Sequence, residues 1–274
     1  MTQEQNISIS LWFDNKAKEA LTFYASIFPN SQVLSSNPVV TEANLSGVQF
    51  VGINGGPVFT PNPSISLMYT IENEEELIKI WNQLTPNGKV LMELGSYPWS
   101  AKYGWVEDKY HVSWQLYLGK LSDVNQQSIA PTLMFTQKTN GLCEEALSYY
   151  NSIFKNFQLQ GVMHYADGDM KGLVQHTQFI ANNFTFMAMD GGLSHNFAFN
   201  EGLSFVISCE NQDEIDYYWN AFTNEGAESQ CGWCKDKYGV SWQIIPKNIH
   251  ALLQSERANQ ELMKMKKIII KDLV

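Results

Sequence analysis

Residues 104–115 read GWVEDKYHVSWQ, and residues 232–243 read GWCKDKYGVSWQ, identical at nine of the twelve positions. The similarity continues on both sides of this stretch. Residues 7–28, ISISLWFDNKAKEALTFYASIF, match residues 129–154, IAPTLMFTQKTNGLCEEALSYYNSIF, with a longer turn in the second copy. Self-similarity at a long period is the sequence signature of a repeated structural unit. The chain is therefore predicted to be an internal duplication.

The two copies set the predicted domain boundaries. Trp81 matches Trp219 at an offset of 138 residues, whereas Trp105 matches Trp233 at an offset of 128. The first copy therefore carries about ten extra residues, a loop insertion that includes 97–99, YPW. A length of 274 residues suits two ordinary domains. We predict a first domain at residues 1–121, a second at 122–246, and a C-terminal helix with an extended tail at 247–274.

Composition and charge narrow the classes of protein. The net charge of −10 disfavours nucleic acid as a partner, because binding its phosphates requires a clustered basic face. No apolar run approaches the roughly 18 residues that span a bilayer. No charged, apolar and small-residue leader opens the chain. We therefore predict a soluble, cytoplasmic protein that does not bind membranes.

The four cysteines are expected to be free thiols, because disulfides are rare in the cytoplasm. Cys231 and Cys234 have the spacing of a redox dithiol, whose reactive thiolate usually lies at the start of a helix. Here a turn and a strand follow the pair, and the first copy has Tyr103 and Val106 instead. Redox catalysis and a structural zinc site are both disfavoured.

Each copy alternates strands and helices twice. Apolar residues recur at helical spacing within residues 17–28 and 146–154. Two more helices, with acidic first turns, are predicted from 73 to 81 and from 211 to 219. Each copy therefore corresponds to two βαβββ-like units, and the predicted fold class is α+β. Runs rich in strand-forming residues occupy 44–53, 65–71, 175–189 and 203–209.

The last strand of each copy is predicted to have two different faces. Trp114 lies opposite Gln115 and Trp242 lies opposite Gln243, because side chains alternate along a strand. We expect helices to cover the tryptophan faces and the glutamine faces to line a concavity. The alternative is that each glutamine amide only forms hydrogen bonds with backbone groups, as amides on strands commonly do. Five tryptophans are predicted to belong to the core: Trp12, Trp81, Trp114, Trp219 and Trp242.

The pattern after Pro246 is helical to Met265 and extended at residues 268–270, III. This apolar tail needs a partner surface. It is expected to dock on the other domain or on a second copy in a homodimer, rather than on a membrane, because it is short and lacks a basic amphipathic face.

The combination of LWFDNKAKEALTFYASIF, NGG or DGG, the repeated GW-xx-DKY-x-VSWQ, and the ending KMKKIIIKDLV resembles the PhnB-like branch of the vicinal oxygen chelate superfamily. That superfamily also holds glyoxalase I, bleomycin-resistance proteins and extradiol dioxygenases. The resemblance covers essentially the whole chain. It implies paired βαβββ modules that form half-barrels around ligand cavities, in two tandem glyoxalase-like domains. Members of the branch are often labelled 3-demethylubiquinone-9 3-methyltransferase, yet no Gly-rich turn for a methyl-donor nucleotide is found.

Metal-dependent members of this superfamily bind a divalent ion through His and Glu residues on the first and last strands of each module. The matching positions here are mostly apolar, and such ions need several oxygen or imidazole donors. We therefore predict no metal and no cofactor. The positions are Ile9, Val51, Ser66 and Gln115 in the first copy, and Pro131, Met187, Ser204 and Gln243 in the second.

The histidines add little to this picture. His176 and Gln178 lie on a predicted strand and are counted as possible ligand contacts, although a lone strand histidine usually has a structural role. His111 replaces Gly239 of the other copy at an expected tight turn, and histidine tolerates positive φ better than most residues. No Ser/His/Asp or Cys/His arrangement emerges, so catalytic residues stay unknown.

The leading hypothesis is a protein that binds a small, partly apolar or aromatic molecule in an aromatic-lined cavity without a metal ion. One alternative is a metal-dependent lyase, isomerase or dioxygenase, and whether the chain is an enzyme stays open. Another is a structural or interaction protein whose cavities are filled by side chains. The copies differ enough that at most one cavity is expected to keep a binding site. The candidate ligand-binding residues are Trp105, Gln115, His176, Gln178, Met187, Ser204, Trp233 and Gln243.

Overall fold

The computed structural model describes residues 6–274, which form four βαβββ modules and a C-terminal segment. Module 1 has β1 (Ile7–Phe13), α1 (Ala17–Ile27), β2 (Gln32–Ser36), β3 (Val40–Leu45) and β4 (Val48–Asn54). Module 2 has β5 (Ile65–Ile71), α2 (Glu74–Leu84), β6 (Lys89–Tyr97), β7 (Ser100–Glu107) and β8 (Ser113–Leu118). Module 3 has β9 (Ile129–Thr136), α3 (Cys143–Ile153), β10 (Gln158–His164), β11 (Val174–Ala181) and β12 (Phe184–Gly192). Module 4 has β13 (Leu203–Cys209), α4 (Gln212–Thr223), β14 (Ala227–Glu228), β15 (Trp233–Lys235) and β16 (Ser241–Pro246).

Two of the predicted strand runs are split by tight turns. The run 44–53 becomes β3 and β4 around Ser46 and Gly47, and the run 175–189 becomes β11 and β12 around Asn182 and Asn183. All four turn residues have positive φ, between 47° and 89°, a region that glycine and asparagine enter most readily. The predicted helix starts are confirmed, because Asn73 and Asn211 cap α2 and α4 through side-chain oxygens that accept backbone N–H bonds.

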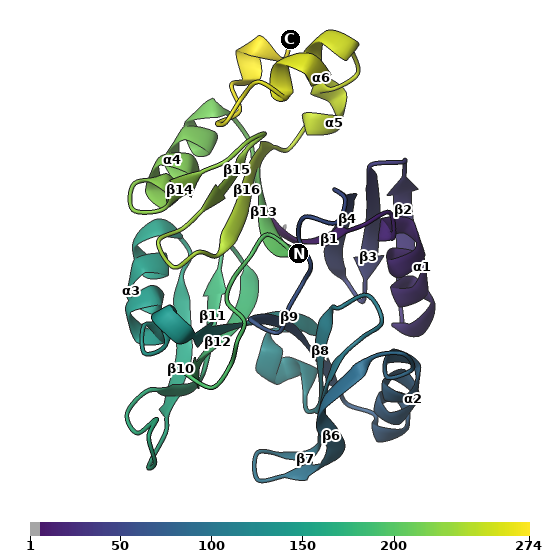
Figure 1. Ribbon diagram of the computed structural model, residues 1–274, viewed down its shortest axis with the longest axis vertical. Coiled ribbons are helices and arrows are strands. Elements are labelled where there is room, and N and C mark those ends of the chain that lie inside the picture. Colours follow the sequence, from purple (N-terminus) through teal and green to yellow (C-terminus); the bar gives the residue numbers. More distant parts are fainter. Residues whose placement is uncertain (1–5) are drawn as a thin grey trace.

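The strands form two eight-stranded sheets (Figure 1). The first sheet has the order β14-β15-β16-β13-β1-β4-β3-β2, and the second has the order β10-β11-β12-β9-β5-β8-β7-β6. Within each sheet two modules join through their first strands, which are antiparallel: β1 with β13 and β5 with β9. The predicted α+β fold of paired βαβββ modules is confirmed.

The pairing of modules does not follow the order of the chain. Each sheet combines one module from each copy: modules 1 and 4 form the first sheet, and modules 2 and 3 form the second. The sheets therefore cross the predicted boundary between residues 1–121 and 122–246, which marks the repeat along the chain. Modules of the same copy meet instead through the core, where the helices and the helix-covered faces of the sheets pack together (Figure 1).

A buried carboxylate holds the two modules of each copy together. Asp108 accepts hydrogen bonds from the Tyr24 hydroxyl (2.6 Å), the Trp114 indole N–H (3.0 Å), and the backbone N–H groups of Tyr110 and Val112 (2.8 and 3.0 Å). Asp236 receives the same four bonds from Tyr150, Trp242, Tyr238 and Val240. Burial raises the pKa of both carboxyls to about 6, against the opposing effect of these donors. The repeated DKY-x-V-x-W motif is thus a structural turn that buries a carboxylate.

The turn after this aspartate explains a difference between the copies. His111 has φ 65° and its counterpart Gly239 has φ 90°. The predicted tight turn with positive φ is confirmed, and it accounts for the histidine without a catalytic role. The side chain of His111 is exposed and bonds to Glu107.

The C-terminal segment contains α5 (Ile249–Leu252), α6 (Glu256–Leu262) and the 3₁₀ turn Ile270–Asp272, so the predicted extended run ends one residue early. It docks on module 4 of its own chain. Ile268 is buried, and its carbonyl and the Ile270 N–H bond to the Gln212 side chain. The α5 residue His250 also reaches Glu42 of β3 (2.8 Å), so the segment bridges the two ends of the first sheet. Within residues 6–274, none of the helices combines the length and apolar character needed to cross a bilayer.

Candidate functional site

Each sheet has a helix-free face, whose side chains alternate with those of the core. On β1, Ile9 and Leu11 lie in the core, whereas Ser10 and Trp12 point to the opposite face. We call the helix-free face of the first sheet the β1/β13 face; it carries Ser10, Trp12, Ser204, Trp233 and Gln243. The helix-free face of the second sheet is the β5/β9 face; it carries Ser66, Trp105, Gln115, Thr132 and Met187.

Two hydroxyl side chains lie opposite each other at the centre of each face. Ser10 is in register with Ser204 where β1 meets β13, and Ser66 is in register with Thr132 where β5 meets β9. A glutamine from the last strand of module 4 or 2 joins each pair. The Gln243 amide donates to Ser204 Oγ (3.0 Å), and the Gln115 amide donates to Ser66 Oγ.

The predicted site residues therefore divide between the two sheets. The structure places Trp105, Gln115, His176, Gln178 and Met187 on the second sheet, and Ser204, Trp233 and Gln243 on the first. It does not bring the eight residues into one site. Neighbouring strands align Trp105 with Gln115, Gln178 with Met187, and Trp233 with Gln243.

On the β5/β9 face Gln115 and Trp105 have partners within the protein, whereas the buried Thr132 hydroxyl has none among residues 6–274. The Tyr103 hydroxyl donates to Gln115 Oε1 (2.9 Å), and the Trp105 indole N–H donates to Ser113 Oγ (2.7 Å). An apolar cluster packs around them. The cluster contains Met68, Tyr103, Val124, Ala130 and Met187, and Met92, Tyr97, Trp105, Tyr117 and Leu121 pack against it.

The sequence insertion of the first copy contributes to this filling. It extends the β6–β7 hairpin, where the rings of Tyr97 and Trp99 stack at 5.1 Å. Both rings also contact Tyr103 edge-on, at 5.7 and 5.9 Å. The insertion predicted as a local loop difference thus supports the tyrosine that binds Gln115.

On the β1/β13 face the groups equivalent to Gln115 Oε1 and to the Trp105 indole N–H lack partners among the described residues. Among residues 6–274, no donor reaches Gln243 Oε1, and the buried Ser10 and Ser241 hydroxyls make no hydrogen bond. The indole N–H of Trp233, the counterpart of Trp105, is likewise without a partner in the described part of the chain. Its ring instead lies edge-on to Trp12, with centroids 6.0 Å apart.

Trp12 corrects the sequence prediction for the core. It was predicted to be buried among the helices, but it lies half-buried on the β1/β13 face, because Leu11 and Phe13 take the core positions of β1. Phe59 packs against it at 5.2 Å. Trp12, Trp233 and Phe59 thus form an aromatic wall beside Gln243.

His176 and Gln178 lie on β11 of the second sheet. The Gln178 amide donates to the Asp123 carbonyl and to Gln160 Oε1, both at 2.8 Å, so its N–H groups are engaged within the protein. Burial lowers the pKa of His176, which favours a neutral imidazole.

Two of the positions matched to metal ligands are shifted by one residue. Ile9 and Pro131 lie on the helix-covered faces, and strand alternation puts Ser10 and Thr132 on the helix-free faces instead. The resulting donors are hydroxyls and amides. Within residues 6–274, no three His, Cys, Asp or Glu side chains come together as a metal would require.

The cysteine pair has no low-pKa thiolate. Cys234 is buried on the helix-covered face, and burial strongly raises its pKa. Cys231, at φ 57°, directs its thiol to the Leu262 carbonyl of α6. Both thiols are free, and the predicted absence of redox character agrees with this environment.

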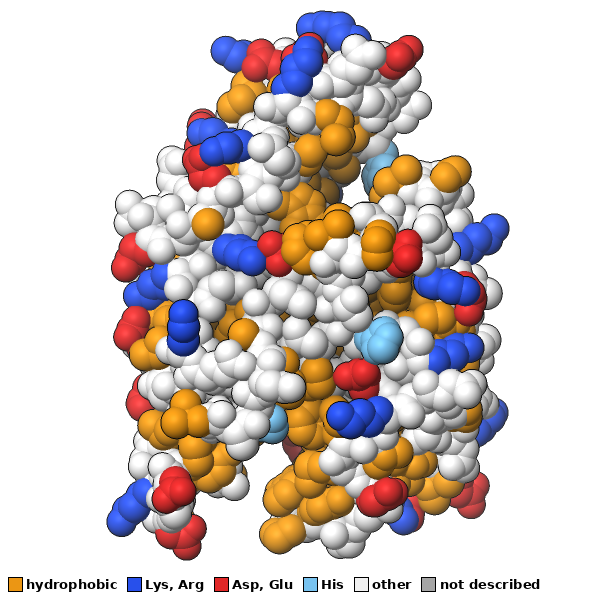
Figure 2. Space-filling view, viewed as in Figure 1, with side chains coloured by type: hydrophobic (Ala, Val, Ile, Leu, Met, Phe, Trp, Pro, Cys, Tyr) orange, Lys and Arg blue, Asp and Glu red, His pale blue; other side chains and the backbone are white. Residues whose placement is uncertain are grey.

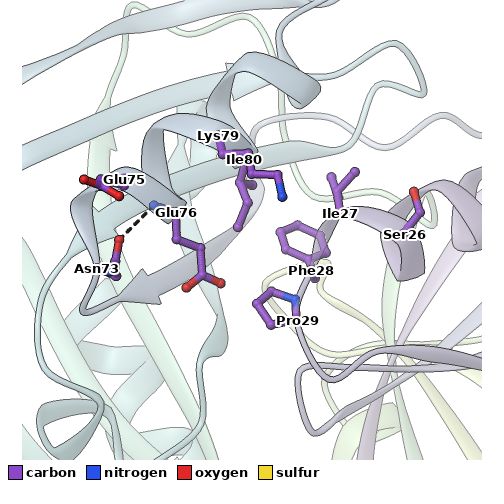
Figure 3. A pocket seen from close by; sticks show the side chains of 9 residues that line it. All are labelled: Ser26, Ile27, Phe28, Pro29, Asn73, Glu75, Glu76, Lys79 and Ile80. Carbon is purple, nitrogen blue, oxygen red and sulfur yellow. Dashed lines mark hydrogen bonds between the residues drawn. The ribbon is translucent and has the colours of Figure 1, made fainter.

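Two surface pockets lie away from all eight candidate residues. One, of about 490 Å³, lies between the end of α1 and the start of α2 (Figure 3), where Phe28 and Ile80 contribute apolar surface and Asn73 is engaged in capping α2. The other, of about 690 Å³, lies between the start of α4 and the C-terminal segment. Asn73 of the first pocket and Asn211 of the second are each engaged in capping a helix.

Sequence reasoning expected at most one cavity to keep a binding site, but it did not assign that site to one of the two faces. It singled out the difference between Tyr103 and Cys231, but a sequence does not show that the tyrosine hydroxyl meets Gln115 across β7 and β8. It also missed Ser10, whose small side chain carries no distinctive pattern and which only the alternation on β1 could have placed. Alternation on the last strand did put Ser241 on the same face as Gln243.

Comparisons with known proteins agree with the architecture. The model of a family described as 3-demethylubiquinone-9 3-methyltransferase matches residues 5–117 and again 127–245. A putative 3-demethylubiquinone-9 3-methyltransferase, PhnB protein, from Bacillus cereus is 40% identical over 42% of this chain and 100% of its own, with a TM-score of 0.40. Glyoxalase I from Zea mays is 10% identical over 89% of this chain and 95% of its own, with a TM-score of 0.54, and a variant of it reaches 0.57. No curated protein matches the chain.

Proposed function

The chain belongs to the family described as 3-demethylubiquinone-9 3-methyltransferase, within the vicinal oxygen chelate superfamily, and we propose that it binds a small, partly apolar or aromatic molecule without a metal ion. The observation that carries the proposal is the composition of the β1/β13 face. Aromatic rings stand beside the buried Ser10 and Ser241 hydroxyls, which are unpaired among residues 6–274, and beside Gln243, whose amide oxygen receives no bond there. Ligand sites are mostly apolar with a few convergent polar groups.

The metal-free part of the proposal rests on the donors. Ser10, Ser204 and Gln243 offer neutral oxygens and an amide, with Val51 at the fourth position of this face. Hydroxyl and amide groups of this kind bind ligands through hydrogen bonds, whereas zinc and similar ions prefer imidazole, thiolate and carboxylate. A metal-dependent lyase, isomerase or dioxygenase is the alternative that the superfamily fold keeps open.

Methyl transfer, which the family description names, has no dedicated feature in this chain. A methyl-donor nucleotide would need a Gly-rich turn between a strand and a helix, and the sequence has none in that context. The family membership therefore accounts for the fold, and the β1/β13 face carries the proposed ligand site.

A second role applies to the β5/β9 face. Its own side chains fill it, with Tyr103 and Met187 at the centre of the apolar cluster. This observation favours a structural role for the second sheet. A cytoplasmic location, the absence of nucleic-acid partners and a homodimer stay predictions.

Native mass spectrometry of the untagged protein, purified without chelators and paired with metal analysis, tests the proposed function. A substoichiometric metal content together with a bound organic mass would support it. A stoichiometric first-row divalent metal would contradict it and favour the metal-dependent alternative. The denatured mass of the same sample is the control, because it separates a bound molecule from a covalent modification.

A further inference from the structure

We propose that ligand binding is confined to the β1/β13 face, that the ligand is an uncharged aromatic molecule with a hydrogen-bond donor, and that Gln243 Oε1 accepts this donor. The inference rests on the proposed function and deepens it. It follows from comparing the glutamine and the tryptophan of this face with their duplicates on the other, since the hydroxyls of Ser10 and its counterpart Thr132 are both unpaired among residues 6–274.

The first comparison concerns the glutamines. Both amides donate to a central serine, but only Gln115 also accepts a bond, from the Tyr103 hydroxyl at 2.9 Å. Cys231 occupies the place of Tyr103 in the second copy, and its thiol turns away to the Leu262 carbonyl. A ligand hydroxyl or N–H at Gln243 would supply the donor that the tyrosine supplies at Gln115.

The second comparison concerns the tryptophans. Trp105 is committed to Ser113 through its indole N–H at 2.7 Å, within the packed cluster. Trp233 makes no such bond to Ser241, and its ring lies edge-on to Trp12. Two partly exposed aromatic rings at an angle of 81° offer faces and edges against which a planar molecule can pack.

Two ion pairs near this face bear on the charge of the ligand. Lys235 bonds to Glu201 at 2.9 Å, and His250 bonds to Glu42 at 2.8 Å. Within the described part of the chain, these two pairs engage Lys235 and His250 with carboxylates, so neither is free to receive a ligand carboxylate or phosphate. Burying an unpaired ligand charge beside the serines would be costly, so a neutral molecule is favoured.

The surface offers room on this side. Figure 2 shows the molecule hollowed between the C-terminal segment and the β2–β3 hairpin, with hydrophobic side chains at the bottom of the hollow. The pair His250–Glu42 joins α5 to β3 across this opening. The buried Ser10 and Ser241 hydroxyls have essentially no solvent-exposed surface, so a ligand meets the aromatic rings and Gln243 first.

The test uses the full chain labelled with 5-fluorotryptophan and followed by ¹⁹F NMR, with phenol as the probe and benzoate and benzene as its charged and donor-free counterparts. Single Trp→Phe variants assign the resonances of Trp12, Trp105 and Trp233. Because small fragments bind weakly, the titration runs to about 10 mM. Phenol is expected to shift the resonances of Trp12 and Trp233 saturably and to leave that of Trp105 in place.

Benzoate, benzene and the Gln243→Leu variant test the ligand's charge and its hydrogen bond to Gln243. Benzoate and benzene are expected to bind at least about fivefold more weakly than phenol, as is phenol to the Gln243→Leu variant, because each lacks one hydrogen bond or adds a charge. The Trp105→Phe variant is the matched control and is expected to bind phenol as the unmodified protein does. The probe is located on the unmodified protein, and the Trp→Phe variants are needed only to assign its resonances.

Saturable shifts at Trp105 would overturn the assignment to the β1/β13 face and leave the proposed function standing. Tighter binding of benzoate than of phenol at Trp233 would overturn the assigned ligand class alone. If phenol, benzoate and benzene moved none of the three resonances, both this inference and the proposed function would be contradicted.

Discussion

Replacing the two duplicate glutamines by leucine should destabilise the protein unequally. In Gln115→Leu the buried Tyr103 hydroxyl and the buried Ser66 hydroxyl both lose their partner. In Gln243→Leu only Ser204 loses one, and an amide oxygen that had no partner is removed. Each buried polar group left unpaired costs about 1–3 kcal/mol. We expect Gln115→Leu to lower the free energy of unfolding by about 2–4 kcal/mol, and Gln243→Leu by about 0–2 kcal/mol.

Urea unfolding followed by far-ultraviolet circular dichroism measures both free energies of unfolding. The slope of the free energy of unfolding against urea concentration should be the same for the variants and the unmodified protein. The comparison is internally controlled, because the two substitutions are chemically identical and occupy duplicate positions. The Tyr103→Phe variant and the double variant Tyr103→Phe/Gln115→Leu complete a double-mutant cycle. We expect this cycle to give a coupling free energy of about 1–2 kcal/mol between the two side chains. Equal losses for the two leucine variants, or a larger loss for Gln243→Leu, would refute the assignment of Gln115 as the glutamine with more partners inside the protein.

Three further predictions concern the duplicate positions. Ser241→Ala should leave stability unchanged or raise it by about 0.5–1 kcal/mol, whereas Ser113→Ala should lower it by about 1 kcal/mol, since only Ser113 has a bond to lose; thermal unfolding compares the two. Asp108 and Asp236 have pKa values of about 6 in the folded chain, above the ordinary value of 3.8. Their contribution to stability is therefore full below about pH 3.8 and is lost as the pH rises through 6, by up to about 3 kcal/mol per carboxyl, and the pH dependence of urea unfolding should lose this component in Asp236→Asn. Gly232→Ala should destabilise the chain by more than about 1 kcal/mol, because φ is 86° and the added Cβ would lie 2.7 Å from the Ile244 carbonyl oxygen; a melting temperature equal to that of the unmodified protein would contradict this.

Much of the fold follows from local signals that a sequence carries in full. Duplication of the GW-xx-DKY-x-VSWQ stretch predicted the repeat, and the switch from period 3.6 to period 2 predicted the βαβββ units. Asn73 and Asn211 marked the starts of α2 and α4, because an N-cap is made by residues only three positions apart. The turns at Ser46 and Asn182 were missed, since apolar alternation runs through them.

The candidate site was predictable only in part. Alternation correctly put Gln115 and Gln243 opposite their neighbouring tryptophans, away from the core. It was applied one residue out of step on β1 and β9, where Ile9 and Pro131 were taken instead of Ser10 and Thr132. A shift by one residue moves a side chain to the other face, so a small alignment error changes the whole donor set.

The sequence by itself determined the number of modules, the faces of their strands and the family to which the chain belongs, because all three depend on residues that are close in the chain or on direct similarity. Tertiary structure alone decided that module 1 pairs with module 4 and module 2 with module 3. Strand alternation specifies which side chains share a face. The backbone N–H and C=O groups at the edge of a strand are the same in every strand, so they do not specify which strand pairs with it. For the same reason, only the folded chain shows that the Tyr103 hydroxyl donates a hydrogen bond to Gln115 Oε1. It also shows that the Cys231 thiol bonds elsewhere, so that Gln243 Oε1 receives no such bond.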